Sequence, residues 1–414
     1  MKLKIEKLAD NGFGVGFLNE KEIFIPYTLP GEEIFIEKIQ KRKGKNFALE
    51  FRVVSRSKKR VEPRCPYFEK CGGCLFQHLS YRDQIKFKRE KLKNLFQRKI
   101  KVLPSPKQFG YRGKIDIVVS SQGIGFRQRG FWNKVIEIDE CPLFGDNAKK
   151  SLSELRKLIR EQKISLYDLE SHKGLIRYLV LREGKFTGQL MVNLVTKREI
   201  EREKLTKYFN FAQSFYLSLN PGLSDVSFGK PLYHFKDEFI QEKILGITYF
   251  IHPNTFFQSN SYQLKNLLKL IAKFVKGKKV LDLYCGVGTF AIFLAKKGYL
   301  VDALELSPSS VKMAKLNAMA NDVYVNFQEG RAEEIDNLNY DTVIVDPPRP
   351  GLGSKIIKKL NESKIQRLIY VSCNPHSLAQ NISQLKNFSL KKIIGIDMFP
   401  QTPEVETIAA LDRK

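Results

Sequence analysis

A cysteine near the carboxyl end of the chain has the surroundings of a nucleophile. Cys373 follows the apolar run RLIYVS and precedes Asn374-Pro375 and the helical pattern HSLAQNISQLK. A thiol next to a helix N-terminus is favoured as the thiolate, which is its reactive form. Two carboxylates follow in FPQTPEVET, and their spacing puts Glu404 and Glu406 on one face of an extended segment. The sequence therefore predicts a thiolate with a carboxylate base, and the pattern does not separate the two glutamates.

A proline-stiffened turn presents a further acid and a cation. The strand DTVIV is followed by Asp346-Pro-Pro-Arg349, and the two prolines favour an extended backbone. We expect Asp346 and Arg349 at the carboxyl edge of a sheet, where ligands bind in open α/β folds. Because a cation stabilises negative charge on oxygen, Arg349 suits an oxygen-rich base or an enolate.

A third segment has the pattern of a nucleotide-cofactor loop. Residues 280–290, VLDLYCGVGTF, read as a buried strand, a turn with two glycines and the start of a helix. Asp282 lies at the end of that strand and Glu305 at the end of the next, where an acidic residue can bind ribose hydroxyls. Ala291 occupies the third small position of the dinucleotide-binding motif G-x-G-x-x-G/A. The spacing alone therefore does not exclude a nicotinamide dinucleotide as the cofactor. The combination resembles S-adenosylmethionine-dependent methyltransferases, which implies that Glu305 binds the ribose and that the loop from Tyr284 to Gly288 wraps the methionine and sugar.

Four of the six cysteines form the full complement of a metal site. They are Cys65, Cys71, Cys74 and Cys141. Four thiolates satisfy either a structural zinc ion or a [4Fe–4S] cluster, and the spacing C-x5-C-x2-C with one remote cysteine leaves both open. The other two cysteines fall in the cofactor loop and at the predicted nucleophile. Six cysteines in 414 residues argue against a disulfide scaffold.

Three regions are expected to position these segments. Residues 1–59 contain short alternating strands with the turn signals DNG, LPGE and KGKN, which predicts a small β-barrel. Residues 60–245 are mixed and predict a central α+β domain that carries the cysteine cluster and a basic helix near 80–100. Residues 246–414 alternate apolar strands with helices, which predicts a doubly wound, Rossmann-like, mainly parallel sheet. The pattern GFGVGFLNEKEIFIPYTLPGEEI in the first region resembles the TRAM domain, an OB-like RNA-binding barrel.

The charge of the chain is high and uneven. It carries 71 Lys+Arg against 44 Asp+Glu, a formal net charge of +27. Residues 82–101 hold nine basic and two acidic residues, whereas residues 301–350 hold four and nine. A uniformly lysine-rich surface would not contain such an acidic stretch, so the distribution favours a nucleic-acid partner. Without an apolar run of about 18 residues, and with the charged start MKLKIEKLAD, the sequence predicts a cytoplasmic protein with no membrane span.

Five motifs in order resemble the RNA 5-methyluridine (uracil-C5) methyltransferase family. They are FFQSN (256–260), LDLYCGVGTF, DPPRPG, VSCNP and FPxTxxVE. The resemblance implies Cys373 as the nucleophile and Glu406 as the base. The implied S-adenosylmethionine contacts are Gln258, Tyr284, Glu305 and Asp346. The implied contacts to the substrate base are Arg349 and Phe256. The implied ligands of a [4Fe–4S] cluster, in preference to zinc, are Cys65, Cys71, Cys74 and Cys141. The chain departs from the family at Gln401 and Glu404, where many members carry His.

The family's chemistry explains why these groups occur together. Uracil C5 is a poor nucleophile toward a sulfonium methyl, and addition of a thiolate at C6 charges C5 as part of an enolate. A general base then removes the C5 proton and the thiolate is eliminated. The target nucleotide must leave its stack, so single-stranded or loop RNA is the expected substrate.

The sequence leaves the RNA substrate undecided, and three other functions have to be compared with uracil methylation. The cluster-bearing members of the family favour 23S ribosomal RNA, with a uridine in the T-loop of transfer RNA as the alternative. A non-catalytic RNA-binding or assembly factor with the same fold, and cytosine-C5 methylation by the same kind of cysteine, stay open. A radical methylthiotransferase needs C-x3-C-x2-C, a spacing that the sequence lacks.

Overall fold

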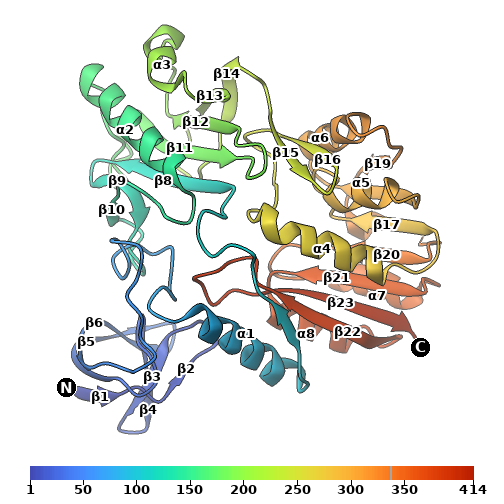
Figure 1. Ribbon diagram of the computed structural model, residues 1–414, viewed down its shortest axis with the longest axis horizontal. Helices are drawn as coiled ribbons and strands as arrows, with labels where there is room; N and C mark the ends of the chain where they lie inside the picture. The colour runs from blue at the N-terminus through green and yellow to red at the C-terminus, as the bar shows by residue number, and fades with distance from the viewer. Residues whose placement is uncertain (336–337) are drawn as a thin grey trace.

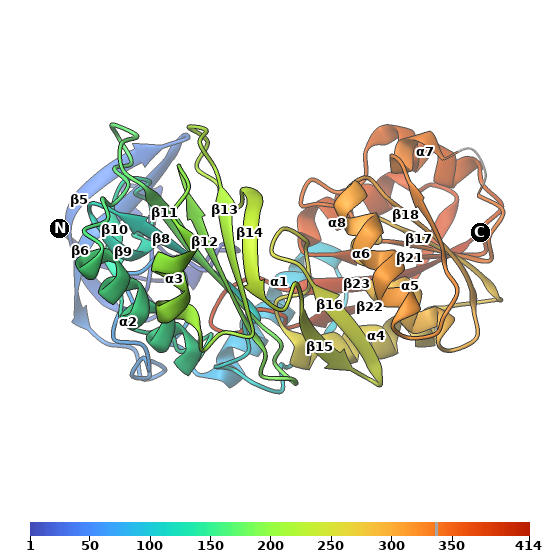
Figure 2. The ribbon, with the colours of Figure 1, turned by 90° about the horizontal axis from the view of Figure 1, so that it is seen from above.

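The chain folds into two lobes with its termini at opposite ends (Figure 1). The computed structural model describes residues 1–335 and 338–414. One lobe contains the N-terminal barrel and a central sheet, and the other contains the C-terminal sheet with helices on both faces. Figure 2 shows the same lobes from above, with the segments that connect them in between. In the part of the chain that is described, no helix combines the length and apolar character needed to cross a membrane.

The barrel consists of six short strands, as the alternating pattern predicted. They are β1 (Lys2–Lys4), β2 (Lys7–Leu8), β3 (Gly14–Leu18), β4 (Lys21–Ile25), β5 (Glu33–Arg42) and β6 (Lys45–Ser55), in the spatial order β1-β5-β6-β4-β3-β2. Alternate side chains such as Ile23, Ile25, Ile34 and Ile36 form the core. The turn between β5 and β6 places Lys43 and Gly44 at positive φ, which suits the KGKN signal.

The central sheet has seven strands and one face covered by helices. The strands are β8 (Lys114–Ser120), β9 (Gly123–Arg127), β10 (Val135–Glu137), β11 (Ile176–Glu183), β12 (Leu190–Thr196), β13 (Ser214–Leu219) and β14 (Lys230–Lys236). Their order is β10-β9-β8-β11-β12-β13-β14. Helices α2 (Asp146–Glu161) and α3 (Arg202–Phe209) bury their apolar sides, including Leu152, Leu155 and Leu205, against this sheet.

The C-terminal sheet has eight strands in the order β19-β18-β17-β20-β21-β23-β22-β7. The strands are β17 (Lys279–Leu283), β18 (Leu300–Glu305), β19 (Asn326–Glu329), β20 (Thr342–Val345), β21 (Arg367–Ser372), β22 (Phe388–Ile396), β23 (Glu406–Arg413) and β7 (Lys101–Leu103). The first five in spatial order run parallel, and β23 is antiparallel to both β21 and β22. The predicted doubly wound, mainly parallel sheet is therefore confirmed as a fold, and it also includes β7, which lies outside residues 246–414.

Helices pack on both faces of the C-terminal sheet. On one face lie α4 (Ser261–Phe274), α5 (Thr289–Ala295) and α6 (Pro308–Met319), and on the other lie α1 (Tyr81–Phe96), α7 (Ser354–Glu362) and α8 (Pro375–Gln384). The hairpin β15 (Ile240–Ile244) and β16 (Ile247–Ile251) packs beside α4 and α6. A short 3₁₀ turn, η1 (Ala332–Glu334), follows β19.

Helix α1 is the basic helix predicted near residues 80–100. Ser80 caps its N-terminus by accepting a hydrogen bond from the backbone N–H of Asp83, and the left-handed Gln97 ends it. The helix and the following strand β7 pack on the C-terminal sheet, although they lie within residues 60–245. Lys88 and Lys91 point into the protein, where Lys88 is fully buried. The basic residues of this helix therefore do not all face solvent, because the ammonium groups of these two lysines bind protein oxygens.

Candidate active site

Cys373 and Glu406 lie next to each other at the carboxyl edge of the C-terminal sheet. Strand β21 ends at Ser372, which pairs with Thr407 of the antiparallel strand β23. This register puts the next residue, Cys373, beside Glu406, the first residue of β23. Both side chains line a cavity of about 880 Å³. The same cavity is lined by every other residue expected at the cofactor or the substrate base: Gln258, Tyr284, Glu305, Asp346, Arg349 and Phe256.

The Cys373 thiol is half-buried among charges of both signs. Burial raises its pKa, and the carboxyl groups of Glu406 and Asp346 raise it further. The Arg349 guanidinium acts in the opposite direction, because its positive charge and its hydrogen bond to the sulfur favour the thiolate. Arg349 is therefore the group in this cavity that counteracts burial and makes the thiolate accessible.

The proline turn is tied to the turn that carries Cys373. The carbonyl oxygen of Arg349 accepts hydrogen bonds from Asn374 Nδ2 and from Ser377 Oγ, each at 3.1 Å. Asn374 is also the N-cap of α8, and its side chain accepts the N–H of His376. The two turns that follow β20 and β21 thus form one rigid unit at the edge of the sheet.

Burial distinguishes the two glutamates that the sequence pattern left equivalent. Glu406 is 5% exposed, and burial followed by repulsion from Asp346 raises its pKa well above the ordinary value. Asp346 also lines the cavity, and burial raises its pKa to about 7. Glu404 keeps 44% of its side chain exposed and lies 3.5 Å from Arg349. Glu406 is therefore the buried carboxyl group of the two, with a raised pKa, and Glu404 is the one that reaches solvent.

The cofactor loop is shaped around Glu305. Its carboxylate accepts the backbone N–H of Gly286 at 3.0 Å and that of Ser307 at 2.8 Å, so the end of β18 holds the loop after β17. Gly286 has a φ of +55°, and a Cβ added there would meet no atom within 4 Å. Tyr284 also adopts a positive φ, of +64°. The strained loop thus leaves its backbone open to the cavity.

Buried Asp282 lies beneath this loop and stabilises it. One carboxylate oxygen accepts the N–H of Ala291 at 3.1 Å, and the other has no partner among the described residues. Burial and the neighbouring Asp346 raise its pKa well above the ordinary value. Asp282 does not line the cavity. Its role is therefore to connect the loop to the start of α5.

Comparison with known proteins places the chain in one family. Residues 80–414 match the tRNA (Uracil-5-)-methyltransferase family, and residues 1–58 match the TRAM domain of tRNA (uracil(54)-C(5))-methyltransferase. The tRNA (uracil(54)-C(5))-methyltransferase of Pyrococcus furiosus is 45% identical over 409 residues, which are 99% of this chain and 98% of the relative. The chain belongs to the RNA uracil-C5 methyltransferase family.

Two further relatives show how far the similarity extends within the family. The crystal structure of Pyrococcus abyssi tRNA (uracil-54, C5)-methyltransferase in complex with S-adenosyl-L-homocysteine is 42% identical, covers 99% of both chains and has a TM-score of 0.92. The 23S rRNA (uracil(747)-C(5))-methyltransferase of Pyrococcus horikoshii is 39% identical over 420 residues, covering 100% of both chains. The uracil-C5 methyltransferase fold and the N-terminal TRAM domain are therefore shared over the whole chain.

Gln401, one departure from the family's residues, is part of a buried polar network. Its side chain accepts a hydrogen bond from Gln84 of α1, and its backbone N–H donates to the same amide, both at 2.9 Å. Its carbonyl oxygen accepts the backbone N–H groups of Leu75 and Phe76. Gln401 therefore connects α1 and the cysteine loop to the segment that leads to Glu406.

The four cysteines expected to bind a cluster are brought into one neighbourhood. Burial, and repulsion between the thiols, raise the pKa of Cys71 to about 11 and that of Cys74 to about 12. Cys65 and Cys141 also lie within electrostatic range, and all four are free thiols. Among residues 1–335 and 338–414, however, no three His, Cys, Asp or Glu side chains have the geometry to hold a metal ion. The thiol chemistry fits a cluster, and the [4Fe–4S] site stays a prediction.

Tyr111 and Arg112 line the cavity from a segment that the sequence analysis did not single out. Gly73 of the cysteine loop lines the cavity beside Tyr111 and Arg112. Tyr111 is fully buried and donates to the carbonyl oxygen of Pro400 at 3.0 Å. Arg112 directly follows Tyr111 in the segment YRGK, which matches no motif used above. Its cation reaches the cavity only because the lobes pack together.

Proposed function

We propose that the chain transfers a methyl group from S-adenosylmethionine to C5 of a uracil in RNA. The observation that carries the proposal is the placement of Cys373 beside Glu406, across the strand pair β21–β23, in the same cavity as the Tyr284–Gly288 loop. The first two groups supply a nucleophile and a base, and the loop supplies a nucleotide site. A non-catalytic RNA-binding protein would have no use for this combination.

The residues present fit S-adenosylmethionine. Glu305 presents a carboxylate that can accept ribose hydroxyls, and Leu304 and Leu306 offer apolar contacts for a purine ring. Gly286 leaves the loop backbone open, and the side chains of Gln258 and Tyr284 complete the expected set of contacts. When bound, the cofactor supplies an electrophilic sulfonium methyl group.

The roles of the chain's own residues follow from their positions. The Cys373 thiolate adds to C6 of the uracil, forming the S–C6 bond and moving the electron pair through C5 to O4 as an enolate. Arg349 is placed to stabilise negative charge, first on the thiolate and then on the enolate oxygen. After C5 has gained the methyl group, Glu406 takes the C5 proton, and the electron pair of that bond expels Cys373 from C6. The elimination regenerates the Cys373 thiolate, and release of the proton from Glu406 to solvent completes the cycle.

Transfer RNA is the proposed substrate in place of the ribosomal RNA expected from the sequence. The three relatives named as tRNA (uracil(54)-C(5))-methyltransferases are 44–45% identical, whereas those named as 23S rRNA (uracil(747)-C(5))-methyltransferases are 38–40% identical. The TRAM match is also to a domain of the tRNA (uracil(54)-C(5)) enzymes. These similarities support position 54 in the T-loop as the target.

The test is methylation of defined RNAs with a covalent trap. Purified protein, S-adenosylmethionine and either a transfer RNA transcript or a 23S rRNA fragment are incubated, and 5-methyluridine is mapped by mass spectrometry. We expect the modification in the transfer RNA and its loss in Cys373→Ser. A transcript with 5-fluorouridine at the target keeps a C5–F bond that the base cannot break, so it should stay covalently attached to the wild-type protein only. Methylation of the ribosomal fragment alone would overturn the choice of RNA, and full activity of Cys373→Ser would overturn the mechanism.

We also propose that Cys65, Cys71, Cys74 and Cys141 bind a [4Fe–4S] cluster. The support is four free thiols close enough to interact electrostatically, of which Cys65 and Cys74 pack against Phe68, Leu75 and Phe76. Anaerobically purified protein should contain four iron and four sulfide per chain, as the formula of the cluster requires, and Cys74→Ser should lose them. One zinc per chain without sulfide would contradict the proposal.

A further inference from the structure

Helix α4 carries a row of lysines on its outer side. Lys265, Lys269 and Lys273 are spaced four residues apart, which places them on one face of the helix. The sequence of the helix, SYQLKNLLKLIAKF, contains no Asp or Glu. The row begins one turn after Asn260, the N-cap, and Asn260 follows the cavity residue Gln258 by two positions. At 1.5 Å per residue, the row from Lys265 to Lys273 extends about 12 Å along the helix, away from the active site.

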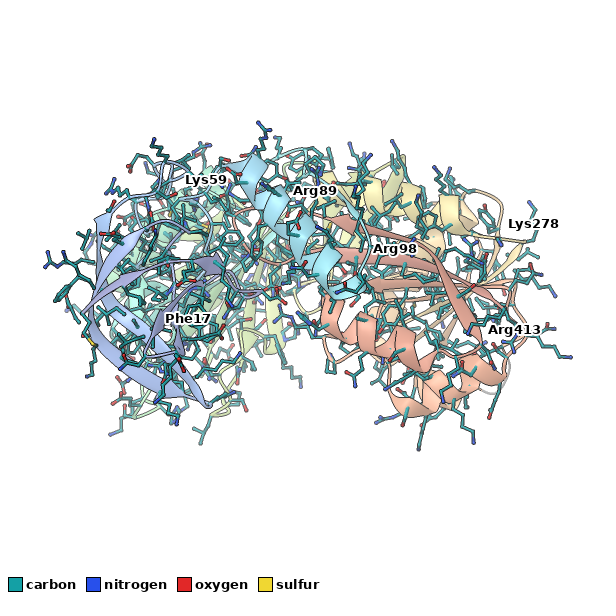
Figure 3. All side chains as sticks on the ribbon, turned by 90° about the horizontal axis from the view of Figure 1, so that it is seen from below. Phe17, Lys59, Arg89, Arg98, Lys278 and Arg413 are labelled. Atoms are coloured by element: carbon teal, nitrogen blue, oxygen red, sulfur yellow. The ribbon has the colours of Figure 1, made fainter. Side chains whose placement is uncertain are left out.

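The far end of the row opens into a second cavity, of about 400 Å³. Its cationic lining comes from the end of α1, from β7, from α4 and from β22: Arg98, Lys99, Lys101, Lys273 and Lys392. Its remaining lining is apolar, with Leu103, Leu270, Ile393 and Ile394. In Figure 3, which shows the molecule from below, Arg98 lies at the C-terminal end of α1, where that helix meets the C-terminal domain.

These five cations are uncompensated. No Asp or Glu lines the cavity, and within residues 1–335 and 338–414 none of the five side chains makes a hydrogen bond or an ion pair. By contrast, Lys276 of the same domain is paired with Asp412 at 2.9 Å. All five side chains are exposed, and such a cluster of like charges creates a positive potential that attracts a polyanion.

Edge protection explains only part of this cluster. Strand β7 is the last strand of the sheet, and lysines on an edge strand prevent pairing with other chains. A cation near the C-terminus of α1 also interacts favourably with the helix dipole. These effects account for Arg98, Lys99 and Lys101. They do not account for Lys273, which comes from helix α4. Lys392 precedes the part of β22 that pairs with β7, so edge protection also applies to it.

Aromatic rings lie at the end of the row nearer the active site. Phe186 and Tyr262 pack edge to face with their centroids 5.0 Å apart, and Phe186 is 38% exposed. The ammonium group of Lys265 lies 3.8 Å from the centre of the Phe186 ring, and that of Lys107 lies 4.5 Å from the centre of the Tyr262 ring. Exposed rings beside cations are the usual platform for an unstacked base and its phosphate.

We propose that Lys265, Lys269, Lys273 and the five-cation cavity form a lysine track that binds the RNA phosphodiester backbone beyond the target uridine. The track is a second RNA contact on the methyltransferase domain, separate from the TRAM barrel. It rests on the proposed function in one respect, that the substrate is RNA. Phosphates bind along the lysine row and in the cavity, so the track contributes to affinity and to its salt dependence while the chemical step remains with Cys373 and Glu406.

The test is RNA binding by a charge-reversed track. The variant Lys269→Glu, Lys273→Glu, Lys392→Glu is compared with Lys315→Glu, Lys355→Glu, Lys364→Glu, a control that reverses three exposed and unpaired lysines elsewhere in the same domain. A full-length transfer RNA transcript is titrated by fluorescence anisotropy over a series of KCl concentrations. We expect the track variant to lose at least about ten-fold in affinity, and the slope of log K against log[salt] to become shallower by about two to three units, since each phosphate contact contributes about 0.7–0.9. The control should stay near the wild type.

The outcomes separate this proposal from the proposed function. Equal affinity and slope for the track and control variants would overturn the track, including the case in which a protein partner covers it. Weaker binding by the track variant, together with no methyl transfer by the wild type, would support the track and count against the proposed function. If the triple variant does not fold, Lys273→Glu and Lys273→Gln are measured instead, and the Glu variant must bind more weakly than the Gln variant.

Discussion

The ammonium group of Lys88 in α1 lies 2.5 Å from a carboxylate oxygen of Asp397, and neither side chain is exposed to solvent. Lys88 also donates to the carbonyl oxygen of Phe399 at 3.1 Å. Tyr81 of the same helix donates to the other oxygen of Asp397 at 2.8 Å. Asp397 begins the segment between β22 and β23, and that segment ends at Glu406. A helix from the first quarter of the chain therefore holds the segment that positions the proposed base.

Replacing Lys88 with Met should destabilise the protein strongly. The change leaves Asp397 buried without its counter-charge, and breaking a buried pair from one side costs about 3–5 kcal/mol. The free energy of unfolding, measured in urea, should fall by that amount. Lys93→Met removes an exposed lysine of the same helix, 3.4 Å from Glu90, and should change it by less than about 0.5 kcal/mol. Equal stability of the two variants would show that the buried pair does not hold α1 to the segment.

Replacing Glu406 with Gln should slow methyl transfer and at the same time activate the thiol. Loss of a general base lowers kcat by roughly 10²- to 10⁴-fold. Because the Glu406 carboxyl group raises the pKa of Cys373, its removal lowers that pKa and increases the thiolate fraction at a given pH. Alkylation of the Cys373 peptide by iodoacetamide, followed by mass spectrometry across the neutral range, should therefore begin at lower pH than in the wild type. Glu362→Gln, at the exposed end of α7, serves as the control and should change neither measurement.

Replacing Arg349 with Gln should move the pH dependence of methylation toward higher pH. The guanidinium lowers the pKa of Cys373, so the neutral amide leaves burial, Glu406 and Asp346 to raise it without opposition. Since the reaction needs the thiolate, the acid limb of the plot of kcat/KM against pH should shift to higher pH, and Arg349→Lys should lie between the two. If the acid limb stayed in place and only the maximal kcat/KM fell, Arg349 would act on the substrate and not on the pKa of Cys373.

Replacing Glu305 with Gln should weaken the binding of S-adenosylmethionine without affecting RNA affinity. The carboxylate holds the N–H groups of Gly286 and Ser307 and presents its remaining lone pairs to the cavity. Hydrogen bonds to a charged group contribute about 1.5–3 kcal/mol, so the Kd from calorimetry should rise by about 10- to 100-fold. Glu329→Gln, on exposed β19, should leave it unchanged. An unaltered Kd in Glu305→Gln would remove this residue from the cofactor site.

The sequence by itself predicted most of the proposed site, because Cys373, Asp346 and Glu305 each belong to a local pattern. Cys373 and Asp346 directly follow apolar strands, and Glu305 ends one. The carboxyl ends of parallel strands share one edge of a sheet, so the strand pattern alone predicts that these side chains meet in one cavity. The barrel and its strands were predictable for the same reason, since an alternating pattern defines which side chains of each strand are buried.

The tertiary structure decided which surfaces meet, and residues far apart in sequence carry that information jointly. Glu404 and Glu406 share a sequence pattern, and the packing of β23 between β21 and β22 buries only Glu406. The run of basic residues 82–101 reads as one surface, yet Lys88 is buried because its charge is matched by Asp397, more than 300 residues away. Arg112 and Gly73 reach the active-site cavity, and Lys392 joins Lys273 in the second cavity, through contacts between distant segments. Periodicity reports which side of an element is buried, whereas the partner of that side depends on packing over the whole chain.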